Sequence, residues 1–237
     1  RTPKIKPMKK IYLLITLLSL SAFCFAQTEQ CGTMEYLEYL KAQDPQLEQR
    51  MEQNEIDLQN RIQNQAESQI SSIITIPVVV HVVYNNSYEN ISNAQIQSQI
   101  DVLNEDFRKL NADTLYIPSA FQGVVADCQI EFCLASSDPN GIATNGITRI
   151  QTWQTSFQNV SPYQEMKYSS LGGTDAWNTT DYLNIWICDL SGLIRGYATF
   201  PGWSIPPSEE GIVIDYEYFG TTGTVTSPHN LGRITTH

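Results

Sequence analysis

The apolar residues of this 237-residue chain gather in short runs separated by polar turns. The run 74–84 is rich in β-branched side chains, which is typical of a strand buried on both faces of a sheet. Three further apolar runs predict central strands of the same sheet, at 129–135, 183–188 and 211–215. The shorter run 196–200 ends at a proline and predicts a strand at the sheet edge.

A helix is predicted directly after the first strand. Ser92 is a good helix cap, and it is followed by apolar residues spaced three and four apart, namely Ile96, Ile100, Leu103, Phe107 and Leu110. Residues 146–151 predict one more short strand. This order predicts an α/β (α+β) fold with a twisted mixed sheet, an antiparallel edge strand and backing helices. His81, inside the first strand, is predicted to be a packed core histidine rather than a ligand.

Residues 27–72 have a more polar composition than the rest of the chain. Met34–Gln43 predicts a helix, and Asp44 and Pro45 predict the cap and first residue of a second helix that reaches Gln69. A narrow apolar stripe on this second helix needs a surface to lie on: Leu47, Met51, Leu58, Ile62 and Ala66. We interpret 27–72 as a propeptide, with the mature domain beginning near Ile73; a helical or disordered spacer is the alternative.

The N-terminus and the charge balance indicate export. Residues 8–26 have the basic start, apolar run and small final residue of a signal peptide, and residues 1–7 are interpreted as an upstream translation artefact. The apolar run is short for a membrane anchor. The net charge is −11, and without the first 26 residues nine basic residues face 25 acidic ones. This balance argues against nucleic acid as a partner and fits a secreted, extracellular protein without a stable membrane anchor.

Five cysteines are present, and export permits disulfides. Cys24 would leave with the signal peptide, whereas Cys128, Cys133 and Cys188 fall in the globular part. We predict that Cys133 lies near Cys188, because both are on predicted core strands. Buried free thiols are the alternative.

The final stretch, 227–237, carries the main chemical signal. Pro228 suits a helix start, and Leu231 and Ile234 share one apolar face, so we predict two helical turns here. Residues 231–237, Leu-Gly-Arg-Ile-Thr-Thr-His, resemble the opening of the zinc motif H-E-x-x-H-x-x-G-x-x-H of the pappalysin (cytophagalysin) family of metzincin metallopeptidases. Four other blocks resemble that family in the same order, namely 104–108, 130–135, 146–150 and 183–188.

The resemblance implies a secreted zinc endopeptidase that hydrolyses peptide bonds with zinc-activated water. His237 would be the first zinc ligand, and a general-base glutamate with two more histidine ligands would follow it. Residues 73–237 would then be the N-terminal part of the catalytic domain, and this fragment would be inactive. Calcium is a second candidate cofactor. The predicted edge strand would bind protein or peptide substrates through Gly196, Tyr197, Ala198, Thr199 and Phe200.

A short N-terminal block, Cys31-Gly32-Thr33, resembles the Cys-Gly element of propeptides in the same family. A thiolate is a suitable fourth zinc ligand, so Cys31 is a candidate latency ligand; a bystander cysteine is the alternative. Two other functions compete with the peptidase. One is a non-catalytic secreted binding or adhesion domain on the same fold, and the other is an unrelated extracellular α/β binding module.

Overall fold

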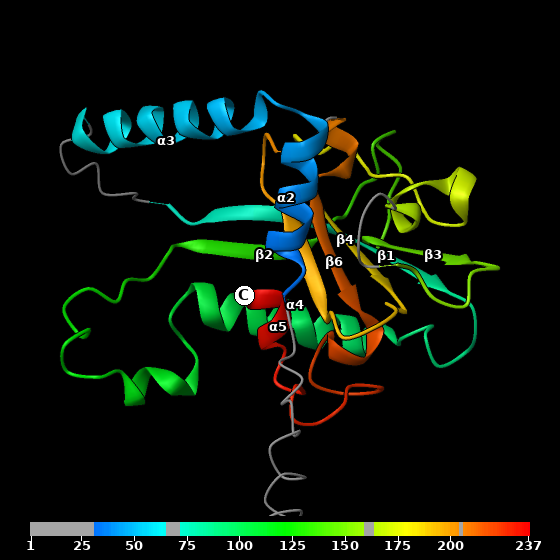
Figure 1. Ribbon diagram of the computed structural model, residues 1–237. Coiled ribbons are helices and arrows are strands. Elements are labelled where there is room, and N and C mark those ends of the chain that lie inside the picture. Colours follow the sequence, from blue (N-terminus) through cyan, green and yellow to red (C-terminus); the bar gives the residue numbers. More distant parts are fainter. Residues whose placement is uncertain (1–30, 65–71, 159–163, 204–205) are drawn as a thin grey trace, which may run out of the picture.

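The computed structural model describes residues 31–64, 72–158, 164–203 and 206–237. Six strands form one mixed sheet in the order β2-β1-β4-β6-β5, with β3 also paired to β1 (Figure 1). Their bounds are β1 Ile74–Tyr84, β2 Ile130–Leu134, β3 Ile147–Gln151, β4 Leu183–Cys188, β5 Gly196–Thr199 and β6 Gly211–Asp215. The predicted mixed sheet with an antiparallel edge strand is confirmed.

Strand β1 is the centre of the sheet. Its first half pairs with β2 and its second half with β3, and its other side pairs with β4, all in parallel. The prediction that 129–135 is a central strand was wrong, because β2 pairs with β1 alone among the described strands. The physical reason is that an apolar run reports burial of the faces of a strand, whereas pairing of its edges depends on the topology.

Helix α4 (Asn93–Phe107) covers one face of the sheet. Ile96, Ile100 and Leu103 pack in one cluster with apolar side chains of β1, β4 and β6. The Ser92 hydroxyl accepts a hydrogen bond from the Gln95 amide at 3.1 Å, which confirms the predicted cap. Leu110 lies beyond the end of the helix and is exposed, so it does not extend the buried helix face as expected.

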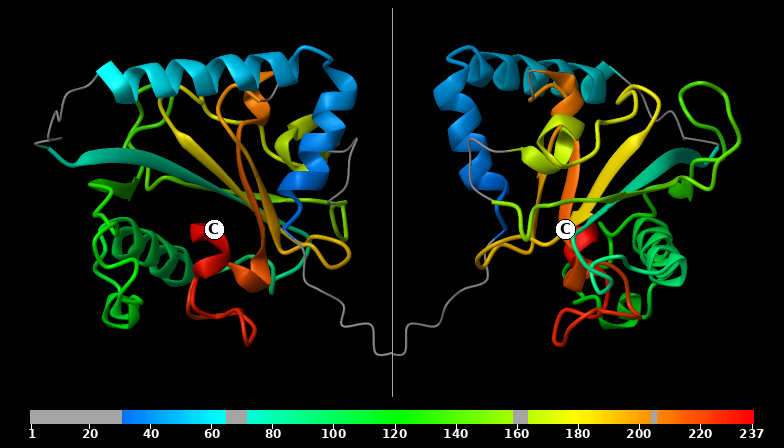
Figure 2. Two further views of the ribbon diagram at one scale, coloured as in Figure 1. Left: turned by 60° about the vertical axis from the view of Figure 1, so that its left-hand side comes forward. Right: turned by 90° about the vertical axis from the view of Figure 1, so that its right-hand side faces the viewer.

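The opposite face is covered by helix α2 (Thr33–Gln43) together with irregular chain between β3 and β4. Tyr36, Leu37 and Leu40 of α2 are buried in the same cluster as Trp186 and Tyr197 of the sheet. Figure 2 shows α2 and α4 on opposite sides of the strands. The N-terminal helix therefore completes the core of this structure and is not an appendage to it.

Helix α3 (Leu47–Asn64) differs from its prediction. It starts two residues after Pro45, and its apolar stripe is largely uncovered: only Leu47 is buried, whereas Leu58 and Ile62 are about half exposed. Figure 1 shows α3 extending along one end of the sheet. The expected contact of the stripe with a surface is limited to its start, where Leu47 and Met51 pack with the core cluster. None of the helices in the described ranges is long and apolar enough to cross a membrane.

Cys133 and Cys188 do not lie close together, so the predicted pairing was wrong. Cys133 is opposite Pro77 at the start of β1, whereas Cys188 follows Ile187, which is opposite Val82. Strand β1 lies between them, and five residues of extended chain add about 16 Å along it. A disulfide needs Cα atoms within about 7 Å. All four cysteines in the described ranges are free thiols; Cys188 is buried and the other three are exposed.

His81 is a fully buried core residue, as predicted. Its Nε2 lies 3.0 Å from Asn184 Oδ1, and its Nδ1 lies 2.7 Å from the Thr148 hydroxyl. Asn184 Oδ1 also accepts from the Trp177 amide, so the oxygen assignment is fixed and Nε2 must carry the proton of the neutral ring. Burial lowers the pKa of His81 to about 4.

We predict a pH-dependent contribution of His81 to stability. Because its pKa is lower in the folded chain than in the unfolded chain, stability is lost as pH falls from about 6.5 toward 4. Chemical denaturation of wild type and His81→Gln at several pH values should show that the advantage of wild type shrinks by on the order of 3 kcal/mol across this window. An advantage that is constant from pH 7 to 4 would contradict the prediction.

The predicted signal peptide, residues 8–26, and the residues before it lie outside the described residues. So does most of the connection between the predicted propeptide and the domain beginning near Ile73. These assignments stay predictions.

Candidate active site

Strand β5 is the antiparallel edge strand of the sheet. It pairs antiparallel with β6, and Gly196 lies opposite Ile214. A side chain at position 196 would not fit, because its Cβ would lie 2.7 Å from the Val213 carbonyl oxygen. Tyr197 and Thr199 point into the core, and Phe200, just after the strand, is exposed. The side of β5 that faces away from β6 can pair with another segment.

That edge is contacted by residues 32–33. The Gly32 amide donates to the Gly196 carbonyl at 3.1 Å, and the Ala198 amide donates to the Thr33 hydroxyl at 3.1 Å. A Cβ on Gly32 would meet Ile194 at 3.0 Å, so glycine permits this close approach. The N-terminal segment therefore uses the main-chain groups of the edge strand that an extended peptide would use.

The C-terminal motif is less helical than predicted. Only one turn forms, α5 (Arg233–Thr236), and Pro228 follows a cis peptide bond in the preceding loop and does not start the helix. Gly232 precedes α5 with φ of 70°, a conformation that glycine adopts without strain. Ile234 packs on the sheet cluster as expected, but Leu231 is exposed. His237 directly follows this turn.

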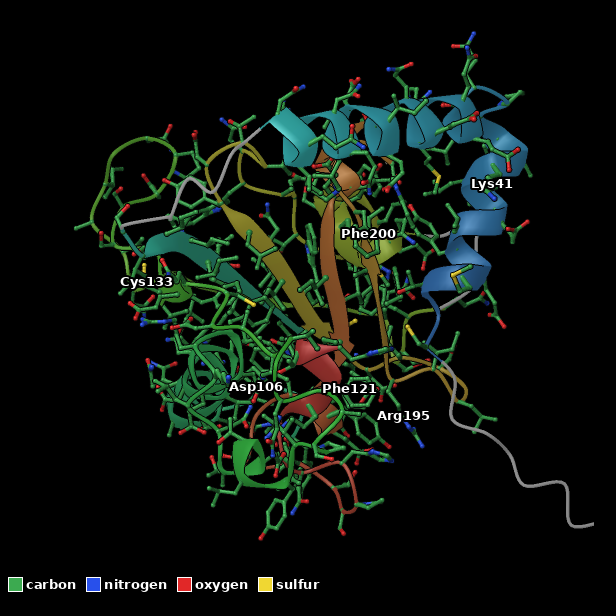
Figure 3. All side chains as sticks on the ribbon, turned by 90° about the vertical axis from the view of Figure 1, so that its left-hand side faces the viewer. Lys41, Asp106, Phe121, Cys133, Arg195 and Phe200 are labelled. Carbon is green, nitrogen blue, oxygen red and sulfur yellow. The ribbon has the colours of Figure 1, made fainter. Side chains whose placement is uncertain are left out.

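The α5 turn is held by a buried carboxylate. Asp106 on α4 forms an ion pair with Arg233 at 2.8 Å and accepts a hydrogen bond from the Thr236 hydroxyl at 2.8 Å. Its side chain is only 6% exposed, although a solvated helix face is the usual place for a carboxylate. Figure 3 shows Asp106 beside the α5 turn. The sequence identifies Asp106 only as a charged residue on a predicted helix. The position of Arg233 in the structure shows that Asp106 holds the α5 turn.

Two buried glutamines of α4 hold the loop that leads to α5. Gln95 donates to the carbonyls of Tyr216 and Phe219, and its side-chain oxygen accepts from the Thr224 amide at 3.0 Å. Gln99 donates to the Gly232 carbonyl at 2.9 Å. Helix α4 therefore connects the sheet, through polar side chains, to the segment that carries His237.

The predicted site residues come together in one cavity of about 730 Å³. Cys31, His237 and the edge strand residues Gly196, Tyr197, Ala198 and Phe200 all line it; Thr199 does not. No Asp or Glu is among the lining residues. Figure 3 labels Arg195 and Phe200, which flank β5. The cavity brings together chain segments about 200 residues apart.

Cys31 and His237 are the candidate metal ligands on this cavity. Cys31 is exposed, and its Sγ lies 3.3 Å from the Thr33 hydroxyl. A thiolate and an imidazole are both donors that zinc prefers. In the described part of the chain no group of three or more His, Cys, Asp or Glu could hold a metal ion. Two donors are thus present, and a complete tetrahedral set would need others.

Several strongly perturbed pKa values belong to groups outside this cavity. Burial raises the pKa of Asp215 to about 7 and lowers that of Lys167 to about 7. Asp215 accepts hydrogen bonds from the amides of Leu190 and Glu217, so it fixes the chain around the end of β6. Neither residue stands out in the sequence, because a single buried charge leaves no periodic pattern.

No family model and no curated protein matches this chain, but solved structures do. Mirolysin in complex with compound 9 is 54% identical, with a TM-score of 0.67, over 70% of this chain and 62% of that chain. Mature mirolysin of Tannerella forsythia, in complex with a cleaved peptide, is 54% identical with a TM-score of 0.66 and the same coverage.

A mutant of Tannerella forsythia promirolysin is 49% identical, with a TM-score of 0.73, over 85% of this chain and 64% of that chain. This chain thus spans less than two thirds of each of these three structures. The mixed sheet with its backing helices matches a metzincin-like protease fold. All three of these similar structures are of mirolysin or its precursor.

We predict that Asp106→Ala destabilises the protein and releases the α5 turn. The substitution leaves Arg233 and Thr236 without their common partner, which should cost about 2 kcal/mol or more. Chemical denaturation gives the change in free energy of unfolding, and hydrogen exchange gives the release of residues 233–237. The control is Glu105→Gln, a neighbouring exposed carboxylate, which should change neither. Equal effects of the two substitutions would contradict the role of Asp106.

Proposed function

We propose that this chain is the N-terminal part of a secreted zinc-dependent endopeptidase of the pappalysin type. The observation that carries the proposal is the single cavity lined by Cys31, His237 and residues of the edge strand β5. The mirolysin structures, at 49–54% identity, support a peptidase over an unrelated binding module.

The edge strand would orient the substrate. A peptide laid along β5 would accept a hydrogen bond from the Ala198 amide and donate one to the Gly196 carbonyl, the two groups now used by residues 32–33. The cleaved peptide bound to mature mirolysin supports peptides as the substrate class. The exposed ring of Phe200, on the cavity wall, would contact the bound chain.

His237 would be one zinc ligand, held by the Asp106–Arg233 and Asp106–Thr236 contacts. Zinc, when bound, would polarise the scissile carbonyl and lower the pKa of a water molecule. The cavity lining contains no carboxylate to act as general base. The base and the remaining ligands would therefore be supplied after His237 in the intact protein, and the fragment alone would be inactive. Calcium stays a second candidate cofactor.

The segment 27–72 would be an inhibitory propeptide. It occupies the main-chain groups of the edge strand, and Cys31 lies on the same cavity as His237. The likeness to promirolysin covers 85% of this chain and that to mature mirolysin only 70%, which supports a segment removed on maturation. A signal peptide at 8–26 and an extracellular location complete the proposal.

A non-catalytic binding domain is the competing function, because no general base lines the cavity. We predict that the protein from the complete reading frame cleaves peptides, and that chelation of zinc or His237→Ala abolishes cleavage. His229→Ala is the matched control, because His229 packs on Tyr218 and should leave activity intact. A folded, full-length protein that binds peptides but never cleaves them would establish the competing function.

A separate prediction concerns latency. In the full-length protein Cys31→Ala should shorten the delay before maturation, because a thiolate in the fourth position of zinc would displace the catalytic water. Cys128→Ala, at an exposed cysteine outside the cavity, is the control. Maturation is followed by gel and by N-terminal sequencing. If both variants mature at the wild-type rate, Cys31 is a bystander.

A further inference from the structure

Lys167 is buried on the sheet face that α2 covers, and the proposed peptidase does not use it. Its side-chain amine donates to the Glu209 carbonyl at 2.5 Å and lies 3.4 Å from the Thr199 hydroxyl. The rings of Tyr36, Trp186 and Tyr197 surround the amine, with centroids 5.8, 5.2 and 5.6 Å away. The three rings form an aromatic cage around an amine that belongs to the protein itself.

The Glu209 carboxylate closes the same pocket. One of its oxygens accepts from the Tyr168 hydroxyl at 2.5 Å, and the other accepts from the Tyr36 hydroxyl at 2.9 Å. Tyr36 comes from α2, 173 residues away in the sequence. Its side chain is almost fully buried, and its ring lies 5.6 Å from that of Tyr197.

These contacts are specific to the side chain at position 36. The other buried residues of α2, Leu37 and Leu40, make only apolar contacts, which any side chain of similar size could replace. A phenol supplies both the ring for Tyr197 and the donor for Glu209. A phenylalanine would leave the part-buried Glu209 carboxylate without one of its two donors, which weakens the attachment of α2.

We propose that Lys167, Tyr168, Tyr197 and Glu209 form a binding site for a tyrosine side chain. Tyr36 fills this tyrosine site and holds the N-terminal helical segment on the sheet independently of Cys31. The ligand class is a phenol presented by a helix of this same chain. The inference does not depend on peptidase activity, because it concerns how the segment is retained and not what the cavity does.

The charge of Lys167 makes retention depend on pH. The titratable groups that face its amine are Tyr36, Tyr197 and Glu209. Burial lowers the pKa of Lys167 to about 7. When α2 lifts, one of the three rings leaves and water reaches the amine, so its pKa rises toward the ordinary value. Above pH 7, lifting therefore takes up a proton, and the segment is held more tightly as pH increases.

The test is hydrogen exchange on the full 237-residue chain, read at the amides of α2. Tyr36→Phe should exchange at least tenfold faster than wild type in α2, with protection of β1 and β4 unchanged. Tyr39→Phe is the matched control: its ring stacks on Tyr36 at 6.2 Å, yet its hydroxyl does not reach Glu209, so exchange should change less than twofold. Cys31→Ala should also change exchange less than twofold.

Two further measurements separate a phenol site from simple apolar packing. The double variant Glu209→Gln with Tyr36→Phe should accelerate exchange by less than the product of the two single effects, because the two residues share one hydrogen bond. The double variant Glu209→Gln with Tyr39→Phe should accelerate exchange by the full product of its two single effects. In Tyr36→Ala, p-cresol should restore protection of α2 and toluene should not. Equal exchange in Tyr36→Phe and Tyr39→Phe, or equal rescue by toluene, would overturn the proposal.

The pH dependence is tested by hydrogen exchange at the same α2 amides, corrected for intrinsic exchange rates. Protection of α2 in wild type should increase from pH 7 to 9, and Lys167→Met, which replaces the amine with an uncharged chain of similar length, should remove the increase. An increase that survives in Lys167→Met would overturn the role assigned to this amine.

Discussion

The need to cover both faces of the parallel strands β1, β4 and β6 governs this structure. Their side chains are apolar on both sides, so each face must be buried against something other than water. Helix α4 covers one face, whereas the other face is covered only when α2 joins the irregular chain between β3 and β4. Removal of the N-terminal segment would expose the apolar side chains that α2 covers.

The polar contacts of α4 connect this core to the candidate site. Gln95, Gln99 and Asp106 project from the helix toward the C-terminal segment and satisfy carbonyls, amides and Arg233 there. A helix that packs on the sheet with its apolar face thus positions the turn before His237 with its polar side chains. The position of His237, the candidate zinc ligand, depends on the same packing that stabilises the fold.

The edge strand is where the N-terminal segment and the proposed peptide substrate would compete. Gly196 and Ala198 can bond one extended segment at a time, and residues 32–33 now occupy them. The tyrosine site lies on the adjoining face and uses no group of the cavity except Tyr197, which lines both. Tyr197 therefore links the position of α2 to the wall of the candidate active site.

The sequence alone determined the strands, the capped helix α4 and the core role of His81, because apolar periodicity and capping act over a few residues. It also determined the metzincin-like resemblance through blocks in a fixed order. Only the tertiary structure decided that β2 is an edge strand, that Cys133 and Cys188 are far apart, and that Asp106 and Lys167 are buried. Each of these depends on which distant segments become neighbours. Strand order and contacts across more than a hundred residues leave no local pattern from which they could be read.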